Sequence, residues 1–251
     1  MNSKTRNPVE FKESVTLLTE LIESRRSIRL FDGNPVPAEV IEKSLDLALL
    51  APNSSNLQPW EFHWVKNPEL KAALIQACFS QAAAATASEL IVCAARTKTW
   101  KRNCEDMKNQ LSLAESRGIR IPKAAWYYYR KLAPLMYTQG PLGLFGFGKR
   151  ILFFFQGFFK PVPREPLSSG DMKIWATKTA ALACENFMLA VRAFGYDSCP
   201  MEGMDSRRIK KLLGLPSDAL IPMVIAVGKR RPEGVTLPRI RGPRSWFIKV
   251  I

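Results

Sequence analysis

The long apolar stretch at residues 171–194 is the feature that most limits what this chain can fold into. It predicts one long helix, and Gly195 directly after it suits the left-handed backbone conformation that often follows a helix end. Any fold for this chain must therefore accommodate a long apolar helix. Shorter helices are predicted at residues 9–24, 37–48, 68–88 and 207–213, the last of them capped by Asp205.

Three further segments predict β-strands. Residues 60–65 alternate aromatic and polar side chains up to Val65, a pattern typical of a strand. Residues 90–95 form an apolar run that suits a buried strand, and residues 223–227 predict another. Because the strands alternate with helices, the predicted fold class is α/β or α+β.

The composition fits a single domain. A chain of 251 residues with 47% hydrophobic content can bury one sizeable core, so we expect one domain over residues 1–251. Residues 1–10 contain no apolar stretch of the kind that a secretory signal requires. We therefore expect a cytoplasmic protein.

Cysteine and histidine usage argues against a metal centre. The five cysteines are odd in number and include no C-x-x-C pair, so buried thiols are favoured over a disulfide framework or a zinc site. His63 is the only histidine, so one chain cannot assemble a multi-histidine site. Its place in a predicted strand favours a structural role.

The net charge of +15 favours nucleic acid, anionic lipid or anionic small molecules as partners. The basic residues form no recognised nucleic-acid-binding motif, so nucleic acid is not expected. The sequence also contains no glycine-rich phosphate loop of the dinucleotide-binding or P-loop type. A bound anion would therefore be held by side chains.

Two short segments offer such side chains. Residues 25–29, Arg-Arg-Ser-Ile-Arg, place three guanidinium groups and a hydroxyl within five positions, which suits a phosphate or an electron-rich ring edge. Residues 51–60, Ala-Pro-Asn-Ser-Ser-Asn-Leu-Gln-Pro-Trp, offer amides and hydroxyls in a loop that leads into a strand. Taken alone, a basic cluster is more often a solvated charged turn.

Together, the two segments resemble the opening of the nitroreductase superfamily. Residues 200–205, Pro-Met-Glu-Gly-Met-Asp, and residues 237–241, Leu-Pro-Arg-Ile-Arg, resemble two later motifs of that family in order and position. The resemblance covers residues 20–95 and 171–245. It implies a nitroreductase-like α+β fold, with a central, mainly antiparallel sheet flanked by helices and a long helix at a homodimer interface.

The resemblance also implies a set of FMN-binding residues. Arg29 matches a position beside the pyrimidine side of the flavin, where a cation stabilises negative charge. Gly203 matches a turn whose backbone N–H reaches flavin N5, and Arg239 with Arg241 matches a pair that binds the 5′-phosphate. The full expected set is Arg25, Arg26, Ser27, Arg29, Asn53, Ser54, Asn56, Gln58, Pro200, Glu202, Gly203, Arg239 and Arg241.

The implied activity is a ping-pong, two-electron hydride transfer. NADH or NADPH would donate to flavin N5, and a nitroaromatic, quinone or similar small molecule would accept. No catalytic acid, base or nucleophile is expected from the protein. Ser54 and Asn56 would complete the site from the second subunit, so we expect a homodimer. Asn53 replaces the usual serine and keeps a polar group there.

Two alternatives remain open at the level of sequence. Within the same superfamily, the chain could be a flavin-dependent reductive dehalogenase or an oxygen-using, flavin-fragmenting enzyme. Outside enzymes, it could be a basic membrane-surface or anion-binding protein with a residual flavin site.

Residues 100–170 match no family motif and are interpreted as a family-variable insertion. Within it, residues 140–160 combine five glycines with seven phenylalanines. The apolar run at residues 151–159 is well short of the roughly 20 residues that span a bilayer. Packing over a partner subunit or the flavin pocket is the favoured interpretation, and peripheral membrane contact through residues 145–160 is the less favoured one.

Overall fold

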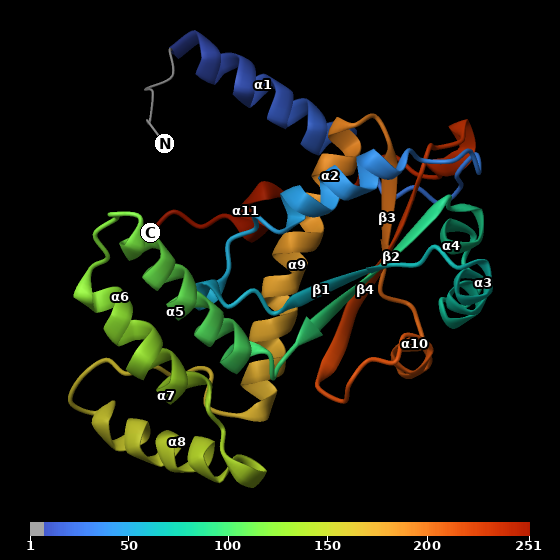
Figure 1. The fold of residues 1–251 in the computed structure, drawn as a ribbon. Coiled ribbons are helices and arrows are strands. Elements are labelled where there is room, and N and C mark those ends of the chain that lie inside the picture. The colour runs from blue at the N-terminus through green and yellow to red at the C-terminus, as the bar shows by residue number, and fades with distance from the viewer. Residues whose placement is uncertain (1–7) are drawn as a thin grey trace.

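Four antiparallel strands form the centre of the computed structural model, which describes residues 8–251, with side chains from Lys12 onward. The order across the sheet is β1–β2–β4–β3 (Figure 1). Helices lie on both faces, so the architecture is α+β. The strands are β1 (Trp60–Trp64), β2 (Glu89–Arg96), β4 (Ala219–Gly228) and β3 (Asp197–Met201).

The three predicted strands are confirmed, and β3 was missed. β3 pairs only with β4 and therefore forms an edge of the sheet, where Pro200 lies opposite Ile225. Proline lacks a backbone N–H and is tolerated on an edge strand. The proline and the polar start at Asp197 and Ser198 hide this strand from a search for apolar runs.

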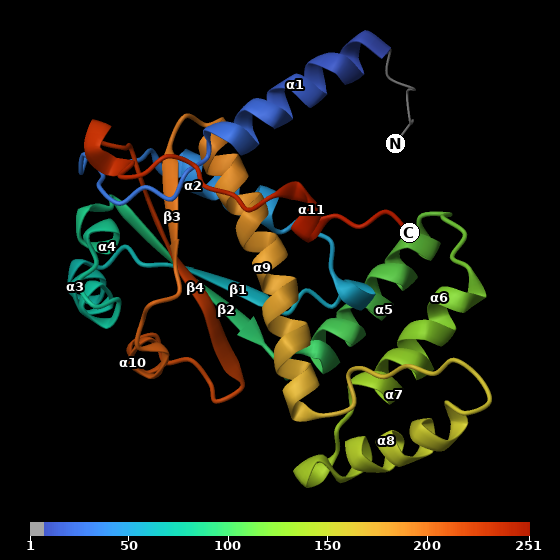
Figure 2. The same cartoon turned by 180° about the vertical axis from the view of Figure 1, so that it is seen from behind.

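The predicted long helix is α9 (Ser169–Ala193), which crosses one face of the sheet (Figure 2). The hydroxyl of Ser168 accepts a hydrogen bond from the Asp171 N–H, and the Asp171 carboxylate accepts one from the Ser168 N–H. This capping box fixes where α9 begins. α1 (Pro8–Ser24) and α2 (Ala38–Ala48) both pack against it.

Alternation along β2 divides the core into two clusters. Ile91, Cys93 and Ala95 face the cluster that contains α9. Leu90, Val92 and Ala94 face the opposite cluster, as the two-residue period of a strand requires. That second side is covered by α3 (Pro68–Ala77), α4 (Ala82–Thr86) and α10 (Ser206–Leu212), the last capped by Asp205 as predicted.

The single helix predicted at residues 68–88 is wrong. The chain breaks between α3 and α4, where Phe79 and Ser80 have φ angles of 57° and 51°. Such left-handed backbone is uncommon outside glycine, and no glycine or proline marks the break in the sequence. The break places Gln81 at the start of α4.

Residues 97–168 form a mainly helical layer at one end of the molecule, to the left of the sheet and below it in Figure 1. Trp100, Cys104 and Tyr137 from this layer join the α9 core cluster. The layer consists of α5 (Trp100–Ser116), α6 (Lys123–Tyr127), a π-helical turn (Tyr128–Leu132), α7 (Ala133–Tyr137), a 3-10 turn (Pro141–Gly143) and α8 (Leu144–Gln156). After β4 the chain continues through a 3-10 turn (Pro232–Gly234) to α11 (Arg244–Phe247).

The thiols are buried, as predicted. All five cysteines are free and buried, and burial raises the pKa of Cys78 to about 11. His63 lies half-buried in β1, and burial lowers its pKa. No helix among residues 8–251 is long and apolar enough to cross a membrane.

Candidate functional site

The arginine-rich segment at residues 25–29 lies along the exposed edge of β3. Ser27 forms an isolated parallel bridge with Ser198, and the Ile28 N–H donates to the Ser198 carbonyl at 3.2 Å. Ile28 is fully buried, whereas its neighbours Ser27 and Arg29 are exposed. The buried isoleucine therefore anchors the segment and leaves the polar side chains on either side of it accessible.

This segment forms a pocket of about 240 Å³ with the C-terminal segment 235–241. Five arginines line the pocket, and no carboxylate of the described residues does. Clustered guanidinium groups offer the planar, two-pronged donors that suit phosphate oxygens. The lining residues are Arg25, Arg26, Ser27, Arg29, Val235, Thr236, Leu237, Pro238, Arg239, Ile240 and Arg241.

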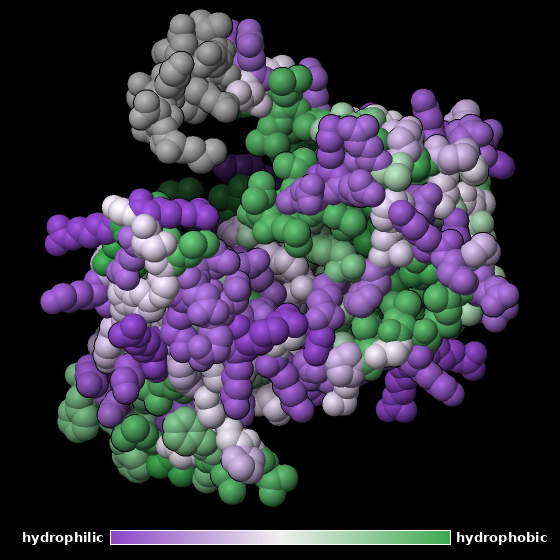
Figure 3. Space-filling model, in the orientation of Figure 1, coloured by the Kyte–Doolittle hydropathy of each residue, from purple (hydrophilic) through white to green (hydrophobic). Residues whose placement is uncertain are grey.

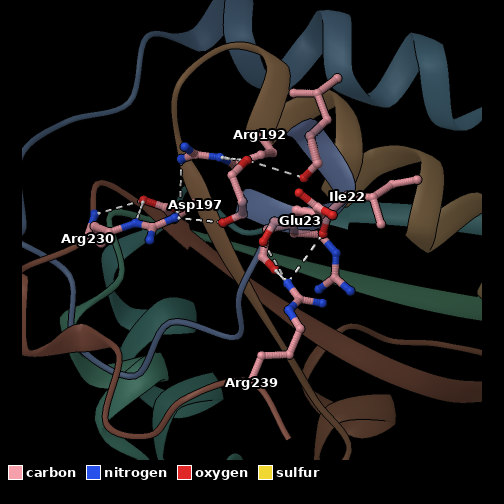
Figure 4. Close-up of polar contacts among 9 residues, drawn as sticks. Ile22, Glu23, Arg192, Asp197, Arg230 and Arg239 are labelled. Carbon is pink, nitrogen blue, oxygen red and sulfur yellow. Dashed lines mark hydrogen bonds and ion pairs between the residues drawn. The ribbon is translucent and has the colours of Figure 1, made fainter. Parts of the chain in front are cut away.

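Arg239 closes the pocket by binding the last turn of α1 (Figure 4). Its Nη2 donates to the carbonyls of Ile22, Glu23 and Arg25 at 3.3, 2.8 and 2.7 Å. The final carbonyls of a helix have no partner within the helix, so a cation is favourable there. Arg26 makes a second link across the pocket, from its Nη2 to the Leu237 carbonyl.

Behind the pocket, the carboxylate of Asp197 joins two arginines (Figure 4). It accepts from Arg192 Nη1 at 3.0 Å and from Arg230 Nε at 2.8 Å, and its side chain is only 3% exposed. Both arginines also hold Ser24: Arg192 donates to its hydroxyl and Arg230 to its carbonyl. The network therefore fixes the residue that directly precedes the arginine segment.

Further along β3, Arg29 lies beside Cys199 of the strand, and the turn at Glu202 and Gly203 comes after the end of the strand. Arg29 Nη1 lies 3.5 Å from the Sγ of Cys199, and burial raises the pKa of that thiol although the guanidinium opposes the shift. Glu202 and Gly203 are exposed in the turn after β3. The Gly203 carbonyl accepts from Gln81 Nε2 at 2.6 Å. Gln81 belongs to none of the sequence motifs, so the sequence did not predict its contact with this turn.

The loop at residues 53–58 does not line the arginine pocket. Ser54 and Ser55 line a separate cavity of about 230 Å³ that shares no residue with the arginine pocket. Their hydroxyls lie 3.1 and 2.9 Å from the Tyr137 hydroxyl, and Tyr129 donates to the Ser55 carbonyl. Nothing in the sequence predicted these tyrosine contacts.

The remaining polar groups of this loop hold its shape. The Asn53 side chain accepts from the Gln58 N–H at 2.8 Å and donates to the Asn56 side chain at 3.3 Å. Asn56 also donates to the Met107 sulfur. Ser55, Asn56 and Gln58 all have positive φ angles, so the loop is tightly folded. A single chain thus brings together the residues around the arginine pocket but leaves this loop apart from them.

Comparisons with known proteins agree on one family. Residues 22–229 match the model of the nitroreductase family. The chain is similar to an NADH dehydrogenase of Thermus thermophilus, with 30% identity over 86% of this chain and 88% of the relative.

Solved structures agree as well. A putative nitroreductase of Bacillus subtilis superposes with a TM-score of 0.71 at 22% identity, covering 94% of this chain and all of the other. A putative nitroreductase from Exiguobacterium sibiricum, solved in complex with FMN, gives a TM-score of 0.66 at 26% identity over 93% and 97% of the two chains. The nitroreductase fold expected from the sequence motifs is therefore confirmed.

Replacing Asp197 with alanine will destabilise the protein by about 3 kcal/mol, because two partly buried arginines lose their shared carboxylate. The free energy of unfolding in urea measures the effect. Glu105→Gln, which removes an exposed ion pair with Lys108, is the control and will change stability little. Equal stability of the two variants would show that the network does not hold the segment.

Proposed function

The chain belongs to the nitroreductase family, and from this membership we propose that it is an FMN-dependent oxidoreductase that takes electrons from NADH or NADPH. Two similarities support the proposal: the Exiguobacterium structure contains FMN, and the Thermus relative is named an NADH dehydrogenase. FMN supplies two-electron hydride chemistry at its N5 atom when it is bound.

The observation that carries the proposal is the arginine pocket. Five guanidinium groups without a lining carboxylate create a strongly positive cavity, which fits the phosphate of FMN. Behind the pocket, Asp197 is shared between Arg192 and Arg230, and Glu185 pairs with Arg25 at 3.5 Å. The other four lining arginines have no carboxylate partner among the described residues, so their charge is available to a ligand: Arg26, Arg29, Arg239 and Arg241.

We assign the phosphate to Arg25, Arg239 and Arg241, with Arg26 and Ser27 beside it. The hydrogen bonds of Arg239 to the last turn of α1 and to the Arg25 carbonyl all come from Nη2. Within the described part of the chain, the side chain of Arg241 donates from Nη1 to the carbonyl of its own neighbour, Ile240, at 2.8 Å and to no other residue. Arg241 is thus the arginine whose loss affects the ligand with the least change to the fold.

Arg29 and the turn at residues 200–203 would serve the flavin ring. Arg29 supplies the positive charge that stabilises negative charge on the pyrimidine side, and the Gly203 N–H approaches N5. A Cβ built on Gly203 would meet only the Gln81 Nε2 within 4 Å, at 3.4 Å, an ordinary contact. The chain itself therefore tolerates a side chain at Gly203, and the glycine is explained by close approach of a ligand. Pro200 and Glu202 flank this approach.

We propose a homodimer in which the loop at residues 53–58 completes the site of the partner subunit. The separation of Ser54 and Asn56 from the arginine pocket within one chain supports this arrangement. So do large apolar side chains that α1, α9 and the C-terminal segment leave exposed, namely Leu18, Ile22, Ile174, Leu182, Trp246 and Phe247. Obligate dimer interfaces have this apolar character.

The proposed acceptor is a nitroaromatic, a quinone or a similar flat, electron-poor molecule, reduced in the second half of a ping-pong cycle. No general acid or base from the protein is assigned. The chain contributes binding geometry and the electrostatic field of Arg29.

Arg241→Ala will raise the dissociation constant for FMN about 10- to 100-fold, the usual effect of losing a charge-assisted hydrogen bond. Riboflavin, which lacks the phosphate, will bind the variant and the unmodified protein alike. Arg29→Ala will instead weaken the binding of both FMN and riboflavin and slow the reduction of the flavin by NADPH. Quenching of flavin fluorescence gives the affinities, and Arg117→Ala, outside the pocket, is the control. An equal loss for FMN and riboflavin in Arg241→Ala would refute the phosphate assignment.

Mixing two inactive variants tests the shared site. If Arg29 and Asn56 of one site come from different chains, an Arg29→Ala/Asn56→Ala heterodimer contains one intact site. Unfolding and refolding a 1:1 mixture will then restore about a quarter of the sites, counted by NADPH oxidation per chain. If both residues serve the same site within one chain, the mixture will stay as inactive as its components.

A further inference from the structure

α8 has its apolar face turned away from the protein. Phe154 and Phe155 are 55% and 60% exposed, and Phe158 and Phe159 in the turn that follows are 69% and 90% exposed. Figure 3 shows hydrophobic side chains gathered along the lower edge of the molecule, where α8 lies in Figure 1. Exposed apolar patches of this kind mark sites of interaction with proteins or membranes. The outward apolar set, here called the α8 patch, is Leu144, Phe147, Ile151, Leu152, Phe154, Phe155, Phe158 and Phe159.

The inward face of α8 is held by a buried lysine. Lys149 is 4% exposed, and its Nζ donates to the carbonyls of Leu135, Met136 and Thr138 at 2.8, 2.7 and 2.8 Å. These carbonyls lie in and just after the last turn of α7, where a cation satisfies acceptors that have no helical partner. Rotating α8 to bury its phenylalanines would break these three bonds.

Close packing at Gly146 fixes the same orientation. A Cβ at this position would collide with the Leu167 carbonyl, so only glycine lets α8 lie this close to the chain. Gly146 and Lys149 are the two buried residues of α8, and they lie three positions apart on one face. The outward position of the phenylalanines is therefore built into the contacts of the helix.

The surroundings of the α8 patch are mainly positive, although Asp171 lies 4.0 Å from Arg150 and Asp218 lines the neighbouring cavity. Residues 116–164 contain nine basic residues and no aspartate or glutamate. Arg150 is exposed beside the patch, and Lys160 follows Phe159. Lys98, Lys101 and Lys173 line a cavity of about 770 Å³ at the start of α8, which Leu142 and Gly143 also line.

This charge decides between occupants. A second copy that seated its own α8 patch on this one would place these basic residues against one another, because a patch that lies on the two-fold axis pairs with itself. An anionic lipid surface attracts them, while its acyl boundary accepts the phenylalanines. α8 has 13 residues and no described helix can span a bilayer, so the helix would lie in the plane of the interface.

We propose that the α8 patch docks this protein on the surface of a membrane that contains anionic lipids. The outward face of α8 enters the boundary between headgroups and acyl chains, and Arg150 and Lys160 contact the headgroups. The docking does not depend on the oxidoreductase activity proposed above. The sequence favoured packing of this segment over a partner subunit or the flavin pocket. Membrane docking replaces that interpretation, because helical periodicity could not show that Lys149 occupies the inward face of α8.

Flotation with vesicles tests the docking on the full FMN-loaded protein. Vesicles of phosphatidylcholine with about 30% phosphatidylglycerol will carry the protein, and phosphatidylcholine alone will carry much less. About 0.5 M salt will weaken the binding through screening. The triple variant Phe154→Ser/Phe155→Ser/Phe158→Ser will lower the partition coefficient at least about tenfold. The matched control is Phe79→Ser, which removes a phenylalanine that is 66% exposed between α3 and α4, and it will float like the unmodified protein.

A second variant guards against misfolding of the first. Arg150→Glu/Lys160→Glu keeps every phenylalanine, and it will lose flotation with anionic vesicles while circular dichroism stays unchanged. The proposal is wrong if the unmodified protein fails to float with anionic vesicles. It is also wrong if the charge-reversed variant floats as well as the unmodified protein. Light scattering tests the other possible occupant, a second copy of the chain. If the unmodified protein forms an assembly larger than a dimer, the triple variant does not, and neither binds vesicles, the α8 patch is a contact between copies instead.

Discussion

The carboxylate of Asp197 is the interaction on which the proposed site depends. It pairs with both Arg192 and Arg230, and these two arginines in turn hold Ser24 at the end of α1. A helix end and an edge strand far apart in the sequence thus meet at one buried charge. One carboxylate shared by two arginines leaves this network with a net positive charge, which adds to that of the neighbouring arginine pocket and favours an anion there.

The edge strand β3 explains why the site lies where it does. Its first residues pair with the arginine segment, Cys199 lies beside Arg29, and the turn at Gly203 follows its end. An edge strand has one row of backbone groups without a sheet partner, so an irregular segment such as residues 27–29 can bind there. The pocket for the phosphate and the turn assigned to the flavin ring are therefore ordered along a single short strand.

Much of this fold follows from local patterns, and the rest depends on contacts that no local pattern encodes. The apolar run of α9 and the strands β1, β2 and β4 were predicted, since each has a clear period or apolar run. β3 was missed because Pro200 and its polar start suit only an edge. The break at Phe79 and the tyrosine contacts of Ser54 depend on tertiary packing, and so does the inward direction of Lys149. The structure gathers five arginines of the predicted FMN site at one pocket, and the loop at residues 53–58, expected to serve the second subunit, lies outside it. Their part in binding FMN stays a prediction.

An absorption spectrum tests the central claim most directly. The purified protein, scanned from about 300 to 600 nm before and after anaerobic addition of NADPH or NADH, reports both the cofactor and its reduction. An FMN-dependent oxidoreductase will show the bands of an oxidised flavin, which bleach when the reduced nicotinamide is added. A protein that binds no flavin even after reconstitution with FMN, or a bound flavin that neither nucleotide bleaches, would contradict it.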